Sequence, residues 1–529
     1  MLDFILTGGL IVDGTGKPGF VTDVAIAGDV IARVGDCSEL AARERVGCAG
    51  AVVAPGFIDM HGHSDEVLLV NPLASSKLRQ GITTEVGGNC GTSPAPLSHR
   101  EQVDRALRLQ TRHGLELSWT DFDGFFAALE RAGCALNFCC LVGLGNTRDA
   151  VDGISPRPLD AGALERECSL VREACAQGAI GVSSGLMYPP GCFADAEELT
   201  ALARAAGDAG GAFYATHLRS EGDQLEAAVE EALAVGRRAE ASVQFSHHKA
   251  AGQKNWGKVH RTLALIDKAK SRGMDVGLDQ YPYKASSTGL DAILPEDVKA
   301  GTRDDVIARL ADARYAAALA ARLEFEWGGR WNDIVISTVS TSRNRNVEGR
   351  SIAQIAAARG RPPAATVLRM LVEERLDVSA IYFTMCESDV RAVLSYGSTC
   401  IGSDAAARAT SGPTSAGRPH PRAFGTFPRV FRRYVRETAL LTLEEAVRRS
   451  TWLPATRLRL RRRGKVAEGW YGDIAVFDPQ RIGDTATYVE PLCYPVGVRH
   501  VFVNGRPAVR DEATTGEMPG RVLRRGRDL

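Results

Sequence analysis

The stretch Ala54-Pro55-Gly56-Phe57-Ile58-Asp59-Met60-His61-Gly62-His63-Ser64-Asp65 places two histidines at the end of an apolar run. The run predicts a buried strand, and because side chains alternate along a strand, His61 and His63 should project from one face. Neutral imidazole is a common metal ligand, and two rings at one strand end can share an ion or flank a pair. The alternative is a polar strand end whose imidazoles form ordinary hydrogen bonds. Further ligands at other strand ends would favour the metal site.

The composition favours a globular protein with a small-molecule partner. The length of 529 residues exceeds one simple domain, so we expect one large domain and a smaller one. The 64 basic and 64 acidic residues give zero net charge, which favours neither nucleic acid nor an anionic membrane as partner. Twelve cysteines without a CxxC pair or secretory signal predict reduced thiols in the cytoplasm, and no apolar run is long enough to cross a bilayer.

Short strands joined by tight turns dominate both ends of the sequence. Residues 4–12, 21–26 and 30–34 have this pattern, and it returns at 473–478 and 500–505. We therefore predict one small β domain built from both termini.

The middle of the chain alternates strands with helices. Residues 224–240, for example, carry apolar side chains at helical spacing. Such alternation implies parallel strands with right-handed crossovers, and eight such units close into a (β/α)8 barrel. The candidate strands are 57–63, 82–90, 136–142, 180–185, 212–217, 243–247, 276–281, 381–385 and 400–404. This is one strand too many, so 381–385 or another segment must lie outside the barrel.

Polar residues gather where the candidate strands end. In a barrel the carboxyl ends of the strands converge on one mouth. Alone, His217 would be an ordinary buried histidine and Cys90 a small apolar residue, but five strand ends with possible ligands favour one shared site. Neighbours on a strand point to opposite faces, so His247 and Lys249 should face the mouth while His248 is structural. The candidate ligands are His61, His63, Cys90, His217, His247 and Asp404.

Taken in order, several segments resemble the N-acyl-D-amino-acid deacylase (D-aminoacylase) family of the amidohydrolase superfamily over nearly the whole chain. Besides the His-x-His stretch, they include Gly88-Asn89-Cys90-Gly91, His217-Leu218-Arg219-Ser220-Glu221, Ser246-His247-His248-Lys249, Asp279-Gln280-Tyr281-Pro282-Tyr283, Gly402-Ser403-Asp404 and His420-Pro421-Arg422. The resemblance implies an α/β fold: a metal-dependent (β/α)8 TIM-like barrel at residues 55–460 and a small β-sandwich domain formed by residues 1–54 and 461–529. An insertion at about 288–331 would cover the barrel mouth as a lid.

The resemblance also implies one tightly bound Zn²⁺ and a second, weaker position. Cys90, His217 and His247 would hold the first ion. His61, His63 and Asp404 would complete the second position around the shared Cys90. A cysteine thiolate is a soft anionic ligand and favours zinc over magnesium or calcium.

The resemblance implies hydrolysis of the amide bond of an N-acyl-D-amino acid or a related D-configured amide. A zinc ion with an open position lowers the pKa of bound water to about 7 and polarises the carbonyl. Asp404 is the candidate general base and acid, although Gly402-Ser403-Asp404 could also be a simple turn at a strand end. The resemblance places substrate contacts at Lys249, Tyr281 and Ser287, with Arg219 and Arg422 as further candidates.

Two other functions stay open. Hydantoinases and dihydroorotases, which open cyclic amides, typically bridge two metals with a carboxylated lysine on the fourth strand, but residues 179–185 contain no lysine. A catalytically silent barrel that binds a ligand is the other alternative. Leu144 stands between Gly143 and Gly145 where family members commonly carry histidine, so we expect an altered pocket.

Overall fold

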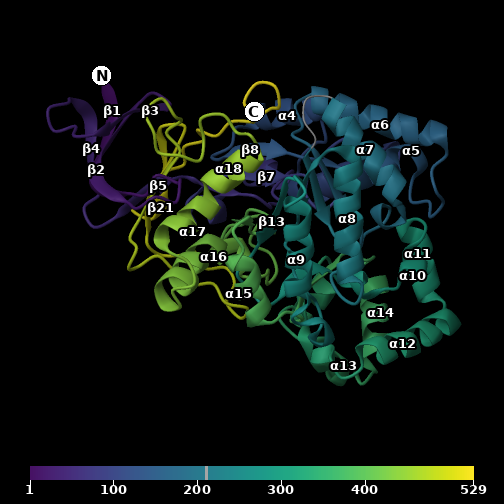
Figure 1. Ribbon diagram of the computed structural model, residues 1–529. Helices are drawn as coiled ribbons and strands as arrows, with labels where there is room; N and C mark the ends of the chain where they lie inside the picture. The colour runs from purple at the N-terminus through teal and green to yellow at the C-terminus, as the bar shows by residue number, and fades with distance from the viewer. Residues whose placement is uncertain (209–212) are drawn as a thin grey trace.

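The computed structural model describes residues 1–208 and 213–529 (Figure 1). Ala212, the expected first residue of the fifth candidate strand, therefore lies outside the described residues. None of the described helices combines the length and the apolar character that crossing a bilayer requires.

Strands from both ends of the chain share one mixed sheet, seen at the left of Figure 1. Its order is β21-β20-β19-β18-β5-β1-β2-β3, with β4 beside β1. The N-terminal β5 pairs in parallel with β1 and antiparallel with the C-terminal β18, where Val53 lies opposite Val476. The strands are β1 (Leu2–Ile11), β2 (Phe20–Ala27), β3 (Val30–Gly35), β4 (Ala42–Gly47), β5 (Val52–Pro55), β18 (Ile474–Phe477), β19 (Val498–Val503), β20 (Arg506–Arg510) and β21 (Ala513–Thr514).

The middle of the chain contains two sheets of parallel strands. One has the order β6-β7-β8 and the other β17-β13-β12-β11-β10-β9. All their residues except Ser242 are buried, which agrees with the near-continuous apolar runs expected of parallel strands covered on both faces. The strands are β6 (Phe57–Asp59), β7 (Ile82–Gly87), β8 (Asn137–Cys140), β9 (Val142–Gly143), β10 (Val182–Gly185), β11 (Phe213–His217), β12 (Ser242–Phe245), β13 (Val276–Gln280) and β17 (Thr399–Ile401).

Backbone hydrogen bonds join these two sheets at both edges. Only Leu141 separates β8 from β9; its N–H donates to Gly87 O on β7 at 3.0 Å, whereas the next N–H, of Val142, donates to Gly181 O before β10 at 2.9 Å. At the other edge, the N–H of Asp404 donates to His61 O at 2.7 Å. The residues that follow β6 and β17 are thus held side by side.

The candidate strand at 381–385 lies outside the parallel sheets. It corresponds to β16 (Val378–Tyr382), the middle strand of an antiparallel sheet with β14 (Ser286–Gly289) and β15 (Ile334–Val339). The helices between these strands surround a separate apolar core, and they occupy the lower right of Figure 1. The interruption of the parallel pattern therefore extends from 286 to 382, beyond the expected 288–331. Its helices are α10 (Glu296–Lys299), α11 (Arg303–Ala311), α12 (Ala313–Trp327), α13 (Ile352–Arg359) and α14 (Pro363–Glu373).

Amphipathic helices pack against the parallel strands. The predicted helix at 224–240 is α8 (Leu225–Ala239), and it buries the apolar side chains spaced along one face. Helix α6 (Ala161–Ala176) begins at Asp160, whose side chain accepts the Ala163 N–H at 2.7 Å. The remaining helices are α1 (Val67–Val70), α2 (Ser75–Leu78), α3 (His99–His113), α4 (Phe122–Ala132), α5 (Leu144–Asp152), α7 (Ala196–Asp208), α9 (Lys258–Lys270), α15 (Glu387–Ser395), α16 (Arg422–Arg429), α17 (Leu443–Ser450) and α18 (Trp452–Arg457).

Candidate metal centre

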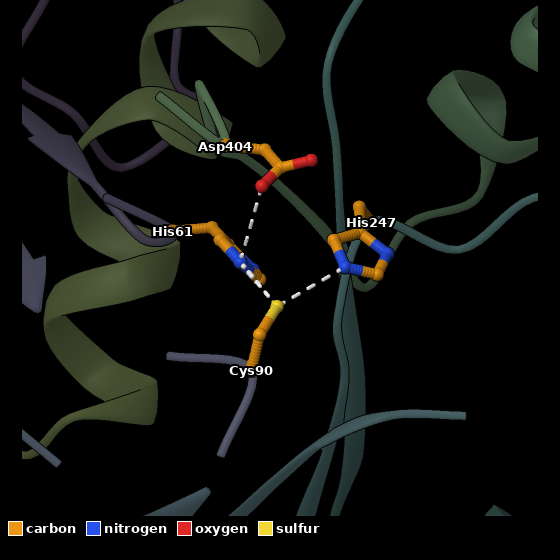
Figure 2. Close-up of side chains that lie close together, drawn as sticks. All are labelled: His61, Cys90, His247 and Asp404. Atoms are coloured by element: carbon orange, nitrogen blue, oxygen red, sulfur yellow. Dashed lines mark hydrogen bonds and ion pairs between the residues drawn. The ribbon is translucent and has the colours of Figure 1, made fainter. Parts of the chain in front are cut away.

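Four side chains that follow different parallel strands meet in one cluster. Figure 2 shows Cys90 between His61 and His247, with Asp404 beside His61. The Cys90 Sγ lies 3.3 Å from the Nε2 atoms of both histidines, and His61 Nε2 lies 3.6 Å from Asp404 Oδ1. One ligand atom from each residue lies within 4.8 Å of all the others, so these four groups can hold a metal ion. His63 joins them, with its Nε2 3.1 Å from Asp404 Oδ1.

The backbone is left-handed at three of these positions. Its φ angle is 53° at Cys90, 35° at His247 and 50° at Asp404. A non-glycine residue in this region is uncommon and costs about 1–3 kcal/mol when it is held in an unfavourable conformation. Hydrogen bonds hold two of the turns: Asp279 Oδ1 accepts the His247 N–H at 2.7 Å, and His61 O accepts that of Asp404. Backbone strain thus coincides with the candidate metal cluster.

His217 lies at the other side of His247. Their ring centroids are 4.4 Å apart, and His217 Nε2 lies 3.9 Å from Glu221 Oε2. The structure therefore brings together all six predicted ligands. His217 Nδ1 is buried and has no hydrogen-bond partner among the described residues. An orphaned imidazole nitrogen beside a thiolate and other imidazoles matches the ligand preferences of zinc.

Carboxylate oxygens lie beside the Nδ1 atoms of two histidines of the cluster. Asp279 Oδ1 lies 3.0 Å from His61 Nδ1, and Glu221 Oε1 lies 3.0 Å from His247 Nδ1. These carboxylates lie on the Nδ1 side of each ring, and the Nε2 atom of each ring faces Cys90 Sγ at 3.3 Å, where it can serve as a metal ligand. Sequence reasoning did not assign a role to Asp279 or Glu221, although both lie in the segments that carry the family resemblance.

The charges of the cluster favour an anionic ligand set. Burial alone would raise the pKa of Cys90, but His61 and His247 outweigh burial and hold this pKa well below its usual value. Burial likewise opposes ionisation of Asp404, yet Arg422 and the nearby histidines keep the pKa of this carboxyl well below its usual range. Cys90 as a thiolate and Asp404 as a carboxylate can therefore bind a cation without first releasing a proton.

A cavity of about 920 Å³ lies over the cluster. Of the predicted substrate contacts, Lys249 and Ser287 line this cavity. The Lys249 ammonium is already engaged: it donates to Glu221 and lies 2.7 Å from His247 Nδ1. Tyr281 is not among the lining residues, and it is buried beneath the Arg422 guanidinium, which lies 4.7 Å from the ring centroid.

The two arginines predicted as further substrate contacts differ in their ion-pair partners. Arg422 lines the cavity, and its Nη1 lies 2.7 Å from Asp404 Oδ2 while its Nη2 donates to Ser287 O at 3.1 Å. Arg219 also lines the cavity, but it pairs with Glu231 and not with a residue of the cluster. His248 turns away from the cluster, and its Nε2 lies 2.8 Å from Thr262 Oγ1 on α9, as expected for a structural histidine.

Comparison with known proteins agrees with this geometry. Residues 45–509 match the amidohydrolase family. The chain belongs to this family. Among curated amidohydrolase relatives, it is 39% identical over 523 residues to the D-aminoacylase of Alcaligenes xylosoxydans xylosoxydans, covering 99% of this chain and 98% of that protein. It is also 39% identical over 527 residues to the N-acyl-D-glutamate deacylase of the same organism, covering 99% and 97%.

A solved amidohydrolase structure superposes over almost all of this chain. It is the N-acyl-D-glutamate deacylase of Bordetella bronchiseptica, complexed with zinc and a phosphonate inhibitor that mimics the tetrahedral intermediate of the reaction. The TM-score is 0.84 at 36% identity, and the alignment covers 99% of both chains. The predicted family is thereby confirmed.

Proposed function

We propose that the protein uses zinc to hydrolyse the amide bond of an N-acyl-D-amino acid. The observation that carries this proposal is the position of Cys90 between His61 and His247, with Asp404 and His217 adjacent, in a chain that matches two deacylases over 99% of its length. The likeness to a deacylase that binds zinc and a mimic of a tetrahedral intermediate supports the metal and the reaction class.

We propose further that the eight parallel strand positions close into a (β/α)8 barrel at residues 55–460. The hydrogen bonds at Leu141 and Asp404 support closure, because they join the two parallel sheets at both edges. The termini, 1–54 and 461–529, would form a β-sandwich whose interior is the apolar cluster that includes Val24, Val53 and Phe502. The cysteines, most of them buried, support a location in the reducing cytoplasm.

The residues fit the proposed metal. Cys90, His217 and His247 would hold one zinc ion, and His61, His63 and Asp404 would complete a weaker second position that shares Cys90. When bound, zinc supplies a water of pKa about 7 and polarises the scissile carbonyl.

Asp404 would move the proton. Its Oδ1 faces His61 and His63, so this atom can accept a proton from the attacking water and return it to the departing amine. Arg422 holds the other carboxylate oxygen at 2.7 Å and thereby fixes the direction in which Oδ1 points.

The substrate would bind in the cavity of about 920 Å³. Ser287 offers a hydroxyl at its wall, and Lys249 and Arg422 place two cations beside Tyr281. Glu221 and Asp404 already pair with these two cations, so a free carboxylate on the substrate would share them and would accept from the Ser287 hydroxyl. The cyclic-amide alternative finds no support, because β10, the fourth parallel strand, contains no lysine.

The test combines metal analysis with paired substrates. We expect about one zinc per chain, lost in Cys90→Ala but kept in Cys493→Ala, which changes a half-buried cysteine away from the cluster. N-acyl-D-amino acids should be hydrolysed and their L-enantiomers should not. Equal release from both enantiomers, or full turnover by zinc-free Cys90→Ala, would reject the proposal. Bound zinc without turnover of either enantiomer would point to cyclic or peptide-like amides instead.

A further inference from the structure

His420 lies two residues before Arg422, whose guanidinium pairs with Asp404. The His420 side chain is buried, and it is not among the residues that line the cavity of about 920 Å³. The rings of Tyr283 and Tyr488 pack edge-on against the imidazole, with centroids 5.0 and 5.1 Å away. The histidine is therefore set back from a substrate in that cavity.

Both ring nitrogens of His420 have a hydrogen-bond partner, and the two partners are of opposite kinds. Nε2 lies 2.9 Å from the Ala285 carbonyl oxygen, to which it donates, and Nδ1 accepts the Arg422 N–H at 3.0 Å. A neutral imidazole offers one donor and one acceptor, so these contacts select the neutral ring with its proton on Nε2. Burial, reinforced by the Arg422 guanidinium, keeps the pKa of His420 well below its usual value, in agreement with this tautomer.

The contact at Nδ1 fixes the start of α16. Arg422 is the first residue of this helix, and the first four N–H groups of a helix have no partner within it. His420 Nδ1 accepts the first of these N–H groups in the protein interior, where an unpaired N–H would be costly. The Arg422 side chain therefore starts from a fixed backbone position, from which its Nη1 reaches Asp404 Oδ2 at 2.7 Å.

The contact at Nε2 fixes the part of the cavity wall that Arg422 touches. Ala285 immediately precedes β14, whose second residue, Ser287, lines the cavity. Arg422 Nη2 donates to Ser287 O at 3.1 Å. The short segment 285–287 is therefore held at both ends, by the His420 ring at Ala285 and by the guanidinium at Ser287.

The C-terminal part of the chain contributes two further contacts to this arrangement. Tyr488, in the connection between β18 and β19, is half-buried, and its hydroxyl lies 3.4 Å from His420 Nε2. Asp484, in the same connection, accepts a hydrogen bond from Arg429, the last residue of α16, at 2.9 Å. The connection between two strands of the terminal sheet thus contacts both the residue before α16 and the end of that helix.

We infer that His420 is a positioning residue of the proposed deacylase, because its ring joins the backbone of Arg422 to the segment that carries Ser287. The ring keeps the Arg422 guanidinium and the Ser287 hydroxyl at the separation that a substrate between them requires. This inference rests on the proposed function and adds to it a residue that acts through Arg422 and Ser287 and does not line the substrate cavity.

The test removes the two hydrogen bonds together and one at a time. His420→Leu can form neither bond. His420→Asn keeps an acceptor for the Arg422 N–H, and His420→Gln keeps a donor for Ala285 O. On an N-acyl-D-amino acid that the parent hydrolyses, kcat/KM should fall about 10- to 100-fold in His420→Leu and less in the two amide variants. The zinc content should match that of the parent in all three.

A double variant shows whether His420 acts through Arg422. In protein that already carries Arg422→Gln, the further change His420→Leu should lower kcat/KM by less than about threefold, because changes within one hydrogen-bonded network are not additive. An independent destabilisation would repeat its full effect. His260→Leu, which changes an exposed histidine of α9 outside the cavity, is the control and should leave kcat/KM unchanged.

The outcomes separate this inference from the proposed function. A parent-like kcat/KM in His420→Leu, equal losses in all three variants, or a loss that repeats in full beside Arg422→Gln would overturn the positioning role while the deacylase function stands. If His420→Leu does not fold, the double-variant comparison is made with His420→Gln, which loses only the acceptor for the Arg422 N–H, and a fully repeated loss again overturns the role. A parent that hydrolyses no N-acyl-D-amino acid would overturn both proposals.

Discussion

Lys77 and Asp59 form an ion pair whose two side chains are completely buried, with Lys77 Nζ 2.7 Å from Asp59 Oδ2. The same ammonium donates to Ser403 Oγ at 2.9 Å and to Ala405 O at 2.7 Å. It thereby ties the strand that precedes His61 to the turn that carries Asp404. This buried cation thus adds to the backbone hydrogen bond from Asp404 to His61 in holding these two candidate ligands together.

Replacing Lys77 by Met should damage both stability and metal binding. The change leaves Asp59 buried without its partner, and breaking a buried pair in this way costs about 3–5 kcal/mol. Urea denaturation should show this loss, and zinc analysis should show weaker occupancy of the position that includes His61. The companion variant Lys77→Met with Asp59→Leu should recover only part of the stability, because it removes both charges of this pair but leaves the buried Glu85, which lies 3.4 Å from Lys77 Nζ, without its cation. A Lys77→Met protein as stable as the parent would contradict this account of the pair.

Asp404→Asn should separate metal binding from turnover. Cys90, His217 and His247 remain, so we expect the tight zinc to stay bound, while kcat falls by about 10²–10⁴, the usual contribution of a positioned acid or base. Metal analysis and initial rates on one preparation check both expectations. Near-normal kcat would remove Asp404 from its assigned role.

Arg422→Gln should reduce activity more than it reduces zinc content. The guanidinium forms an ion pair with Asp404 Oδ2 and donates one hydrogen bond to Ser287 O, and a hydrogen bond that involves a charged group is worth about 1.5–3 kcal/mol. We therefore expect kcat/KM to fall roughly 10- to 100-fold. Arg314→Gln, which changes an exposed arginine of α12 outside the cavity of about 920 Å³, serves as the comparison and should leave kcat/KM nearly unchanged once folding is confirmed. Equal losses in both variants would indicate a general effect on folding.

Glu167 should make the protein less stable as the pH rises. Burial and the nearby Glu198 raise the pKa of Glu167 to about 8, against the smaller opposing effects of Thr147 and Arg148. A carboxyl whose pKa is higher in the folded than in the unfolded state favours the folded state while it is protonated. Stability is therefore lost between about pH 4.5 and 8, as the unfolded chain ionises first.

Glu167→Gln should remove this pH dependence. Urea denaturation at pH 9 should find the variant more stable than the parent by about 1–3 kcal/mol, and at pH 5 the two should differ little. The Gln side chain can keep the contact with Thr147 Oγ1, which lies 2.8 Å from Glu167 Oε1. An equal difference between the proteins at both pH values would show that shape, and not ionisation, is responsible.

That the six candidate side chains lie together could be predicted because parallel strands bring their carboxyl ends together. The structure shows a second cause of this convergence, which the alternation of side chains along a strand does not explain. β12 ends at Phe245 and β17 at Ile401, so His247 and Asp404 lie beyond the regular strands, and left-handed turns direct their side chains. Strand alternation nevertheless assigned His247 and His248 to opposite sides, as observed.

Other features left no usable pattern in the sequence. Asp279 and Glu221 contact the far nitrogens of two ligand histidines, and no fixed spacing marks such partners. The segment 286–382 was underestimated because β16 is short and apolar and is followed by a helix, like a strand of the parallel sheet. Only its antiparallel pairing with β14 and β15 distinguishes it.

The sheet formed by both chain ends can be completed only late in translation. β5 leaves the ribosome early, but its partner β18 follows the whole metal-binding region of the chain. At about 5–20 residues per second, on the order of tens of seconds separate the two strands. Until then one edge of β5, a strand of Val52, Val53, Ala54 and Pro55, has no partner from this sheet and is open to pairing with other nascent chains. Premature termination before residue 474 would leave that edge exposed permanently, so incomplete copies of this enzyme should aggregate and should not accumulate as soluble fragments.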